Sequence, residues 1–139
     1  MSKLVAVQGC TIGYETDPSS SSLSLAATIS VANAKVSSGN KKAYKDKITV
    51  TIASGTITLN SVPAGASTAT GAVPPGTIDI SGTSSKNTTE GDKYVLEDDE
   101  GDATFICTFT QISGPNPIPV NVKITAKVTD AGQNVLNVT

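Results

Sequence analysis

The sequence predicts an all-β fold of antiparallel hairpins, packed as a compact sandwich or as a β-rich cap. Several segments place an apolar residue at every second position, which gives a strand one apolar and one polar face. No segment shows the 3.6-residue period of an amphipathic helix. Aromatic residues are only 4% of the chain, while Thr, Ser, Gly and Val are plentiful, and such residues suit pleated, half-buried strands. The 139 residues are expected to form one domain.

The segment from Gly82 to Thr110 organises this prediction. A short apolar run at 93–96 is followed by the acidic stretch 97–102, and then by apolar residues at alternate positions. We expect two strands joined by an acidic turn, and we expect this hairpin to form part of the core. The alternating apolar residues of its second strand are Ala103, Phe105, Cys107 and Phe109.

Alternation and turn residues predict the other elements. Residues 15–22 should form an exposed loop, because Pro18 and the serines after it have no apolar side chain to bury. The chain is expected to reverse at 53–55 and form a hairpin. Residues 61–76 contain three prolines, three glycines and no side chain larger than valine, which predicts a loop that leaves the single domain 1–139 as an internal excursion. Strands are expected at 3–7, 10–12, 23–31, 48–52, 57–59, 77–81, 118–128 and 135–138.

Two stretches of the chain resemble each other. Residues 34–52 and 85–106 share a lysine, a glycine-containing turn, Lys-Ala-Tyr or Lys-Tyr-Val, an acidic residue and then an alternating strand. Both a structural repeat and a chance similarity in a Thr-rich chain explain this, and the sequence leaves the two open.

Charge and hydropathy argue against a nucleic-acid partner and against a membrane span. The net charge is −2, and all ten basic residues are lysines, whereas a phosphate-binding surface favours clustered Arg. The cluster of Lys41, Lys42, Lys45 and Lys47 is better explained as a solvated rim that discourages pairing at a sheet edge. Because there is neither a signal-like apolar run at the N-terminus nor a window of about 20 apolar residues, we expect a soluble, unprocessed chain without a membrane span.

The sequence lacks histidine and the residue combinations of the common catalytic sites. There is no His, so neither a His-based triad nor the usual general base at neutral pH is available. Cys10 and Cys107 are too few for a zinc site; we expect two reduced, buried thiols, with a single disulfide as the alternative. The expectation is a protein that is not an enzyme and has no cofactor.

One acidic stretch concentrates oxygen ligands. It could hold a structural cation such as Ca²⁺, but the spacing of an EF-hand loop is not met. A solvated acidic turn is the favoured interpretation. The residues are Glu97, Asp98, Asp99, Glu100 and Asp102.

Two motifs resemble the PAAR-like proteins. KLVAVQGCTIGY, at Lys3 to Tyr14, resembles the start of these proteins, where an extended segment leads into a Gly-Cys or Gly-Ala turn. SSKNTTEGDKYVLEDDEGD, at Ser84 to Asp102, resembles their recurrent hairpin. The resemblance implies a small β-rich cap on the trimeric β-helical spike of a phage baseplate or related contractile machine. The Pro-Ala-Ala-Arg tetrapeptide and the metal-binding histidines of the family are absent here, so the resemblance implies no metal site.

These expectations combine into a structural virion protein made in the bacterial cytoplasm. It would cap or decorate the central spike or baseplate of a contractile tail for envelope penetration, with the trimeric spike or other virion proteins as its partner. The alternative is a β-sandwich module for capsid decoration, a tail or adhesion, because rigid sheets of small residues serve all these roles.

Overall fold

The computed structural model describes residues 3–84, 93–114, 116–134 and 137–138, and every regular element within them is a β-strand. The all-β prediction is therefore confirmed. The strands are β1 (Lys3–Leu4), β2 (Thr11–Asp17), β3 (Ser20–Ile29), β4 (Ser37–Ser38), β5 (Lys41–Lys42), β6 (Lys47–Leu59), β7 (Ala66–Val73), β8 (Gly76–Ser81), β9 (Glu100–Gln111), β10 (Ile118–Asp130) and β11 (Asn137–Val138).

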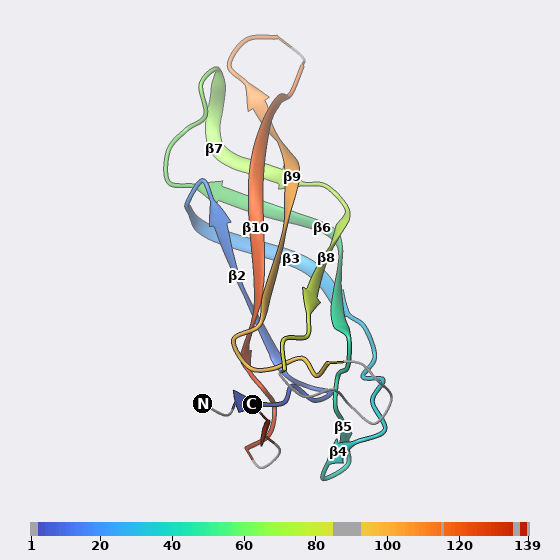
Figure 1. Ribbon diagram of the computed structural model, residues 1–139. Helices are drawn as coiled ribbons and strands as arrows, with labels where there is room; N and C mark the ends of the chain where they lie inside the picture. The colour runs from blue at the N-terminus through green and yellow to red at the C-terminus, as the bar shows by residue number, and fades with distance from the viewer. Residues whose placement is uncertain (1–2, 85–92, 115, 135–136, 139) are drawn as a thin grey trace.

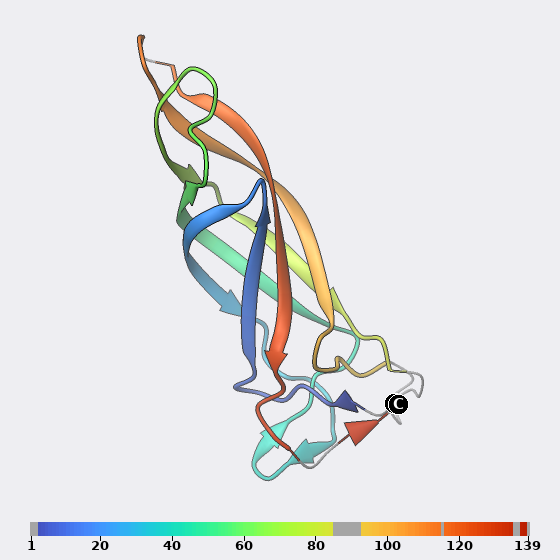
Figure 2. The same cartoon turned by 90° about the vertical axis from the view of Figure 1, so that its left-hand side faces the viewer.

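Seven strands form one antiparallel sheet that curls into a nearly closed, barrel-like shape (Figures 1 and 2). Its order is β2-β10-β9-β7-β6-β3. β8 pairs with the first half of β6 and β7 pairs with the second half, so the two act as one strand interrupted at Pro74 and Pro75. A single curled sheet, rather than a sandwich of two sheets, encloses the core.

The chain is elongated, with its two ends at the same end of the molecule (Figure 1). β1 pairs with β11 there, and β4 pairs with β5. The loops that join β6 to β7 and β9 to β10 stand at the opposite end (Figures 1 and 2). We call these ends the base, formed by the described parts of residues 3–10, 31–47, 82–99 and 131–138, and the apex, formed by residues 60–65, 112–114 and 116–117.

The alternating apolar residues fill the inside of the sheet. Phe105, Cys107 and Phe109 on β9 are at most 4% exposed, as the sequence predicts. They belong to one core cluster with Ile48 and Ile57 on β6, Ile80 on β8 and the inner residues of β10. The inner residues of β3 are only partly buried, because β3 and its chain neighbour β2 are not paired with each other.

The expected hairpin across the acidic turn is wrong. Residues 93–96 do not pair with β9; Tyr94 and Leu96 instead form isolated bridges with Lys45 and Val5. β9 pairs with β10 and β7. Both runs are extended and apolar. Val95 shares the main core with β9, whereas Tyr94 and Leu96 are buried in a separate cluster, so alternation alone does not show which strands are partners.

Two further turns do not lie where the sequence predicts them. The expected loop 15–22 shrinks to Pro18 and Ser19, because β2 continues to Asp17 and β3 begins at Ser20. The serines at 20–22 form the first part of β3, where the strand is partly or fully exposed. No apolar side chain is therefore required there. The expected turn at 53–55 is also wrong, because β6 continues through these residues and pairs with β3 along its length. β3 ends at Ile29 and leaves Val31 79% exposed.

The Pro/Gly-rich stretch 61–76 is a loop over only part of its length. Residues 66–73 form β7, in which Ala66 and Val73 are 3% exposed. Gly71 lies against the ring of Phe109, and an added Cβ would be 2.6 Å from its Cε2 atom. Phe109 therefore fills the space that a larger side chain on β7 would occupy, which explains why β7 has no apolar alternation to detect.

No helix in the described part of the chain is long and apolar enough to cross a membrane.

Candidate partner-binding site at the base

Three segments far apart in sequence meet at the base and form a triangle of β-bridges. The segments are 5–7, 43–45 and 94–96, and we call them together the base triangle. Antiparallel bridges join Val5 to Leu96, Val7 to Ala43, and Lys45 to Tyr94. Each segment is thus antiparallel to both of the others. Three segments can meet this condition only when they form the sides of a triangle.

The central residues of the base triangle are joined by a closed cycle of backbone hydrogen bonds. The Ala6 N–H donates to the Val95 carbonyl at 2.8 Å, the Val95 N–H to the Tyr44 carbonyl at 3.1 Å, and the Tyr44 N–H to the Ala6 carbonyl at 2.9 Å. Each central residue therefore donates to one neighbour and accepts from the other. Rotation by one third of a turn maps this pattern onto itself.

A second cycle of backbone hydrogen bonds joins the residues that lie two positions before and two positions after the central residues. The N–H two positions after each central residue donates to the carbonyl two positions before the next central residue. These bonds run from Gln8 to Lys42 at 2.8 Å, from Asp46 to Lys93 at 2.7 Å and from Glu97 to Leu4 at 2.8 Å. All six hydrogen bonds therefore follow a threefold pattern, although the three segments belong to one chain and differ in sequence.

The pseudo-threefold arrangement continues into the sheet. Each segment of the base triangle passes through a residue with positive φ, namely Gly9, Asp46 or Asp98, and enters a long strand, namely β2, β6 or β9. Each long strand is followed by a strand that returns to the base: β3, the β7–β8 pair or β10 (Figures 1 and 2). The fold therefore consists of three two-strand units around one axis, which we call hairpin units although β2 and β3 are not paired with each other.

The side chains of the base triangle close the end of the sheet. Ala6, Tyr44 and Val95 belong to the main core. Their neighbours along the chain, with the exception of Lys45, point the other way and form a second buried cluster. That cluster contains Val5, Val7, Ala34, Ala43, Tyr94 and Leu96.

The similarity of 34–52 and 85–106 reflects a structural repeat, because both stretches include a segment of the base triangle and the strand that follows it. Sequence reasoning missed the third copy. It is the opening stretch 3–14, which was singled out only for its resemblance to PAAR-like proteins. The copies have turns and linkers of different length, so an alignment at a fixed period does not find them.

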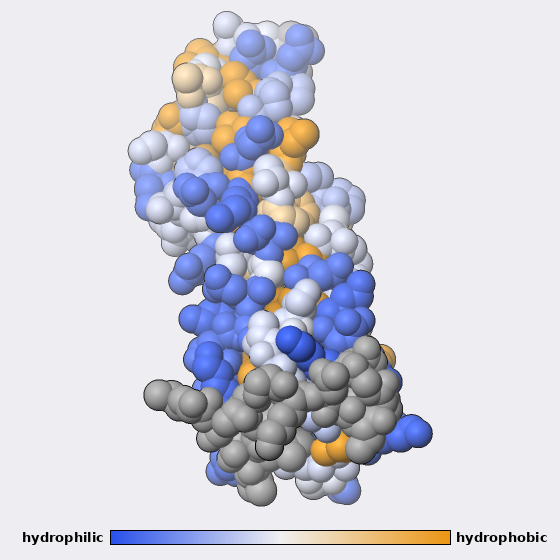
Figure 3. Space-filling model, viewed as in Figure 1, coloured by the Kyte–Doolittle hydropathy of each residue, from blue (hydrophilic) through white to orange (hydrophobic). Residues whose placement is uncertain are grey.

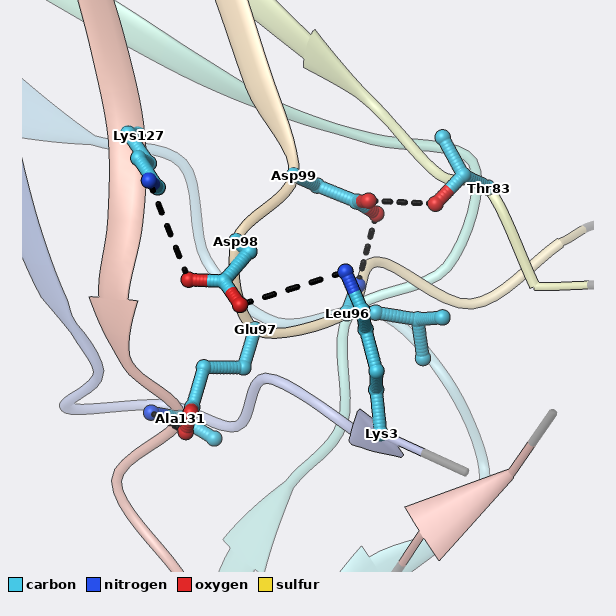
Figure 4. Close-up of polar contacts among 8 residues, drawn as sticks. All are labelled: Lys3, Thr83, Leu96, Glu97, Asp98, Asp99, Lys127 and Ala131. Atoms are coloured by element: carbon cyan, nitrogen blue, oxygen red, sulfur yellow. Dashed lines mark hydrogen bonds and ion pairs between the residues drawn. The ribbon is translucent and has the colours of Figure 1, made fainter. Parts of the chain in front are cut away.

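The acidic stretch is the connection between the base triangle and β9, and its side chains contact different neighbours (Figure 4). Asp99 is 6% exposed. Its carboxylate accepts the Leu96 N–H at 2.8 Å and the Thr83 hydroxyl. Asp99 therefore fixes the turn to its own base segment and to the end of β8.

The other acidic residues of this stretch are more exposed. Asp98 lies 3.9 Å from both Lys3 and Lys127 (Figure 4), and its side chain is 52% exposed. Glu97 accepts the Ala131 N–H at 3.4 Å. Glu100 and Asp102 lie on β9, outside the turn. The structure therefore divides the five predicted cation ligands among different contacts, and no group of three or more such residues able to hold a metal ion occurs in the described residues.

Both cysteines are free and buried in the structure. Burial raises the pKa of the Cys10 thiol to about 11 and also raises the pKa of Cys107. Burial likewise raises the pKa of Tyr44 to about 12. At neutral pH these groups stay protonated, and a protonated thiol is a poor nucleophile.

Two hollows on the outer surface were not expected from the sequence. One, of about 450 Å³, lies between β7 and β9 and is lined by Thr, Gly, Phe109 and uncharged amides, with no ionisable group. The other, of about 170 Å³, brings Glu15 and Glu100 together with Lys127 on the outside of β10. Both carboxylates are on exposed residues, so this is a solvated group of charges.

Comparisons of the chain with protein-family models, with curated proteins and with solved structures found no match.

Proposed function

We propose that this protein is a non-enzymatic structural component of a phage or phage-like contractile tail, where it caps the trimeric spike. The observation that carries the proposal is the pseudo-threefold base. A single chain whose backbone repeats three times around an axis can offer each subunit of a homotrimer a similar contact. The three segments themselves are largely buried, so exposed residues beside them, such as Lys42 and Lys93, would make this contact. One copy then closes the end of the trimer without leaving any subunit unmatched.

The rest of the molecule suits a mechanical role. Antiparallel strands of up to 13 residues run along the molecule, and continuous ladders of hydrogen bonds resist deformation. The base triangle ties residues 5–7 to segments from the middle of the chain. The described side chains leave no buried nitrogen or oxygen without a hydrogen-bond partner, as expected of a rigid native fold.

Stoichiometry tests the proposal. The protein is mixed with a candidate trimeric spike protein from the same genome, and the mixture is analysed by size-exclusion chromatography with light scattering. The expected complex contains one copy of this chain for each trimer. Three copies for each trimer would instead indicate decoration of the spike's sides, and failure to co-elute at every salt concentration would contradict a role at the spike.

Charge reversal at equivalent positions locates the contact. Lys42 and Lys93 each lie two residues before a central residue of the base triangle, and both are exposed. The double variant Lys42→Glu/Lys93→Glu should weaken spike binding at least tenfold, because charges at an interface control association strongly. Lys123→Glu, on an exposed position of β10, is the matched control and should leave binding unchanged.

A further inference from the structure

The apex differs from the base in charge. The two long hairpin units contain no Asp, Glu, Lys or Arg from Ile48 to Ile78 or from Ala103 to Val122. The cross-strand neighbours Asp17 and Lys123 are the charged residues of β2 and β10 nearest to the apex. Everything beyond them toward the apex is uncharged, whereas most lysines and acidic residues lie in or near the base.

The uncharged end also exposes aliphatic side chains. Val62 is 56% exposed and Ile112 is 71% exposed, and both are in the apex loops. Ile106, 56% exposed, lies in the middle of β9, within the uncharged part of the chain. On the face seen in Figure 3 the hydrophobic residues are more extensive toward the apex, and strongly hydrophilic residues dominate lower down.

The two apex loops are bonded to each other and internally. The Ile112 N–H donates to the Gly65 carbonyl at 3.0 Å, and the Ala66 N–H donates to the Pro63 carbonyl at 3.0 Å. Pro63 and Pro117 have no N–H to satisfy. Backbone groups that already have partners lose little when they leave water.

Polar side chains near the apex also donate to the protein's own backbone. Ser67 donates to the Thr110 carbonyl at 3.3 Å and Thr68 to the Thr70 carbonyl at 3.2 Å. Gln111, with its amide in the orientation that satisfies both polar atoms, donates to the Ser113 carbonyl at 2.9 Å. The hydroxyl and amide groups of this end therefore do not depend on water alone.

We propose that the apex inserts its two loops into the interfacial region of a lipid bilayer, with Val62 and Ile112 as the inserting side chains. A bilayer penalises charge, and the apex loops carry none. The inference deepens the proposed function, because a cap that docks through its base presents the apex to the envelope.

Vesicle flotation tests the inference. The full chain is mixed with vesicles of pure phosphatidylcholine and, separately, with vesicles that contain one quarter phosphatidylglycerol. We expect measurable flotation with both and no more than a twofold difference between them, because the apex carries no charge. Absence of flotation with phosphatidylcholine would overturn the inference, and so would binding restricted to the anionic vesicles, since that would point to the lysines of the base.

Substitutions locate the inserting surface. The double variant Val62→Asp/Ile112→Asp should lower the partition coefficient at least tenfold, because each change puts a charge into the bilayer interface. Val31→Asp is the matched control: Val31 is 79% exposed but belongs to the base, so partitioning should stay within twofold. Equal losses in both variants would contradict insertion through the apex. Unchanged melting temperatures confirm that these exposed sites leave the fold intact.

The two ends can be tested independently. The apex double variant should still bind the spike, and Lys42→Glu/Lys93→Glu should still float with phosphatidylcholine vesicles. If the chain binds the spike but not vesicles, only the inference about the apex fails. If it binds vesicles but not the spike, the apex inference stands and the role at the spike fails.

Discussion

At the scale of single residues, the acidic turn shows how neighbouring carboxylates acquire different roles. Asp99 is buried and accepts hydrogen bonds from a backbone N–H and a hydroxyl, whereas Asp98 is exposed between two lysines. Sequence reasoning identified the stretch as a turn but treated its side chains as equivalent. The difference depends on Thr83 and Lys127, which are distant in sequence and reach the turn only in the folded chain.

Asp99→Ala should destabilise the protein by about 1–3 kcal/mol, because the buried Leu96 N–H loses its acceptor. The Thr83 hydroxyl can turn to water, since Thr83 is exposed. Asp99→Asn keeps an oxygen for Leu96 and should recover most of the loss. Chemical denaturation monitored by circular dichroism measures the free energy of unfolding of both variants.

Asp98→Asn is the control for this comparison. It removes two exposed ion pairs, each worth about 0–1 kcal/mol, and Asn tolerates the positive φ of 74° at this position. If Asp98→Asn cost as much as Asp99→Ala, the proposed difference between the two carboxylates would be wrong.

At the scale of elements, strands with large apolar residues at alternate positions were predictable and strands of small residues were not. β9 and β10 bury Phe, Val and Ile on one face, so their existence follows from the sequence. β7 presents Ala and Gly to the core beneath an aromatic ring from β9, and it was taken for a loop. The pairing of strands was harder still to predict. Residues 93–96 and β9 are neighbours in sequence, but residues 93–96 bridge to other base segments and β9 pairs with β7 and β10.

Gly71→Ala should destabilise the sheet by about 1–3 kcal/mol, the usual cost of overpacking a core. The added Cβ would lie 2.6–2.8 Å from three atoms of the Phe109 ring, and this ring is 1% exposed and has little room to move. Urea denaturation gives the free energy of unfolding for the comparison.

The matched control is Ala72→Val on the next residue of β7. Ala72 is on the exposed face of the strand, so the larger side chain should change stability by no more than about 0.5 kcal/mol. A Gly71→Ala variant as stable as Ala72→Val would show that Phe109 yields easily and that β7 is loosely packed.

At the scale of the whole molecule, composition and alternation predicted the all-β class but not the pseudo-threefold arrangement. The units that begin with Ala6, Tyr44 and Val95 are unequally spaced along the chain. Their hydrogen bonds are equivalent while their side chains differ: a methyl, a phenol and an isopropyl group point into the same core. The symmetry is a property of the backbone, and a search for similar side chains finds only traces of it. The proposed role of the base in binding a partner rests on this backbone symmetry, so the pattern of side chains in the sequence does not reveal it.

This arrangement makes a prediction about cooperativity. The six hydrogen-bonded amides of the two cycles come from Ala6, Gln8, Tyr44, Asp46, Val95 and Glu97. Opening any one segment breaks bonds to both of the others, so the three segments should unfold as one unit although they are remote in sequence. Native-state hydrogen exchange followed by NMR should give these amides the same opening free energy within about 1 kcal/mol, close to that of global unfolding. Amides of the two-residue ribbon of β4 and β5 should exchange through local opening at lower free energy. If the amides of Ala6 and Gln8 opened at least about 2 kcal/mol more easily than the other four, the N-terminal segment would be an attached strand rather than one side of a closed triangle, and the base would lack the threefold surface that capping a trimer requires.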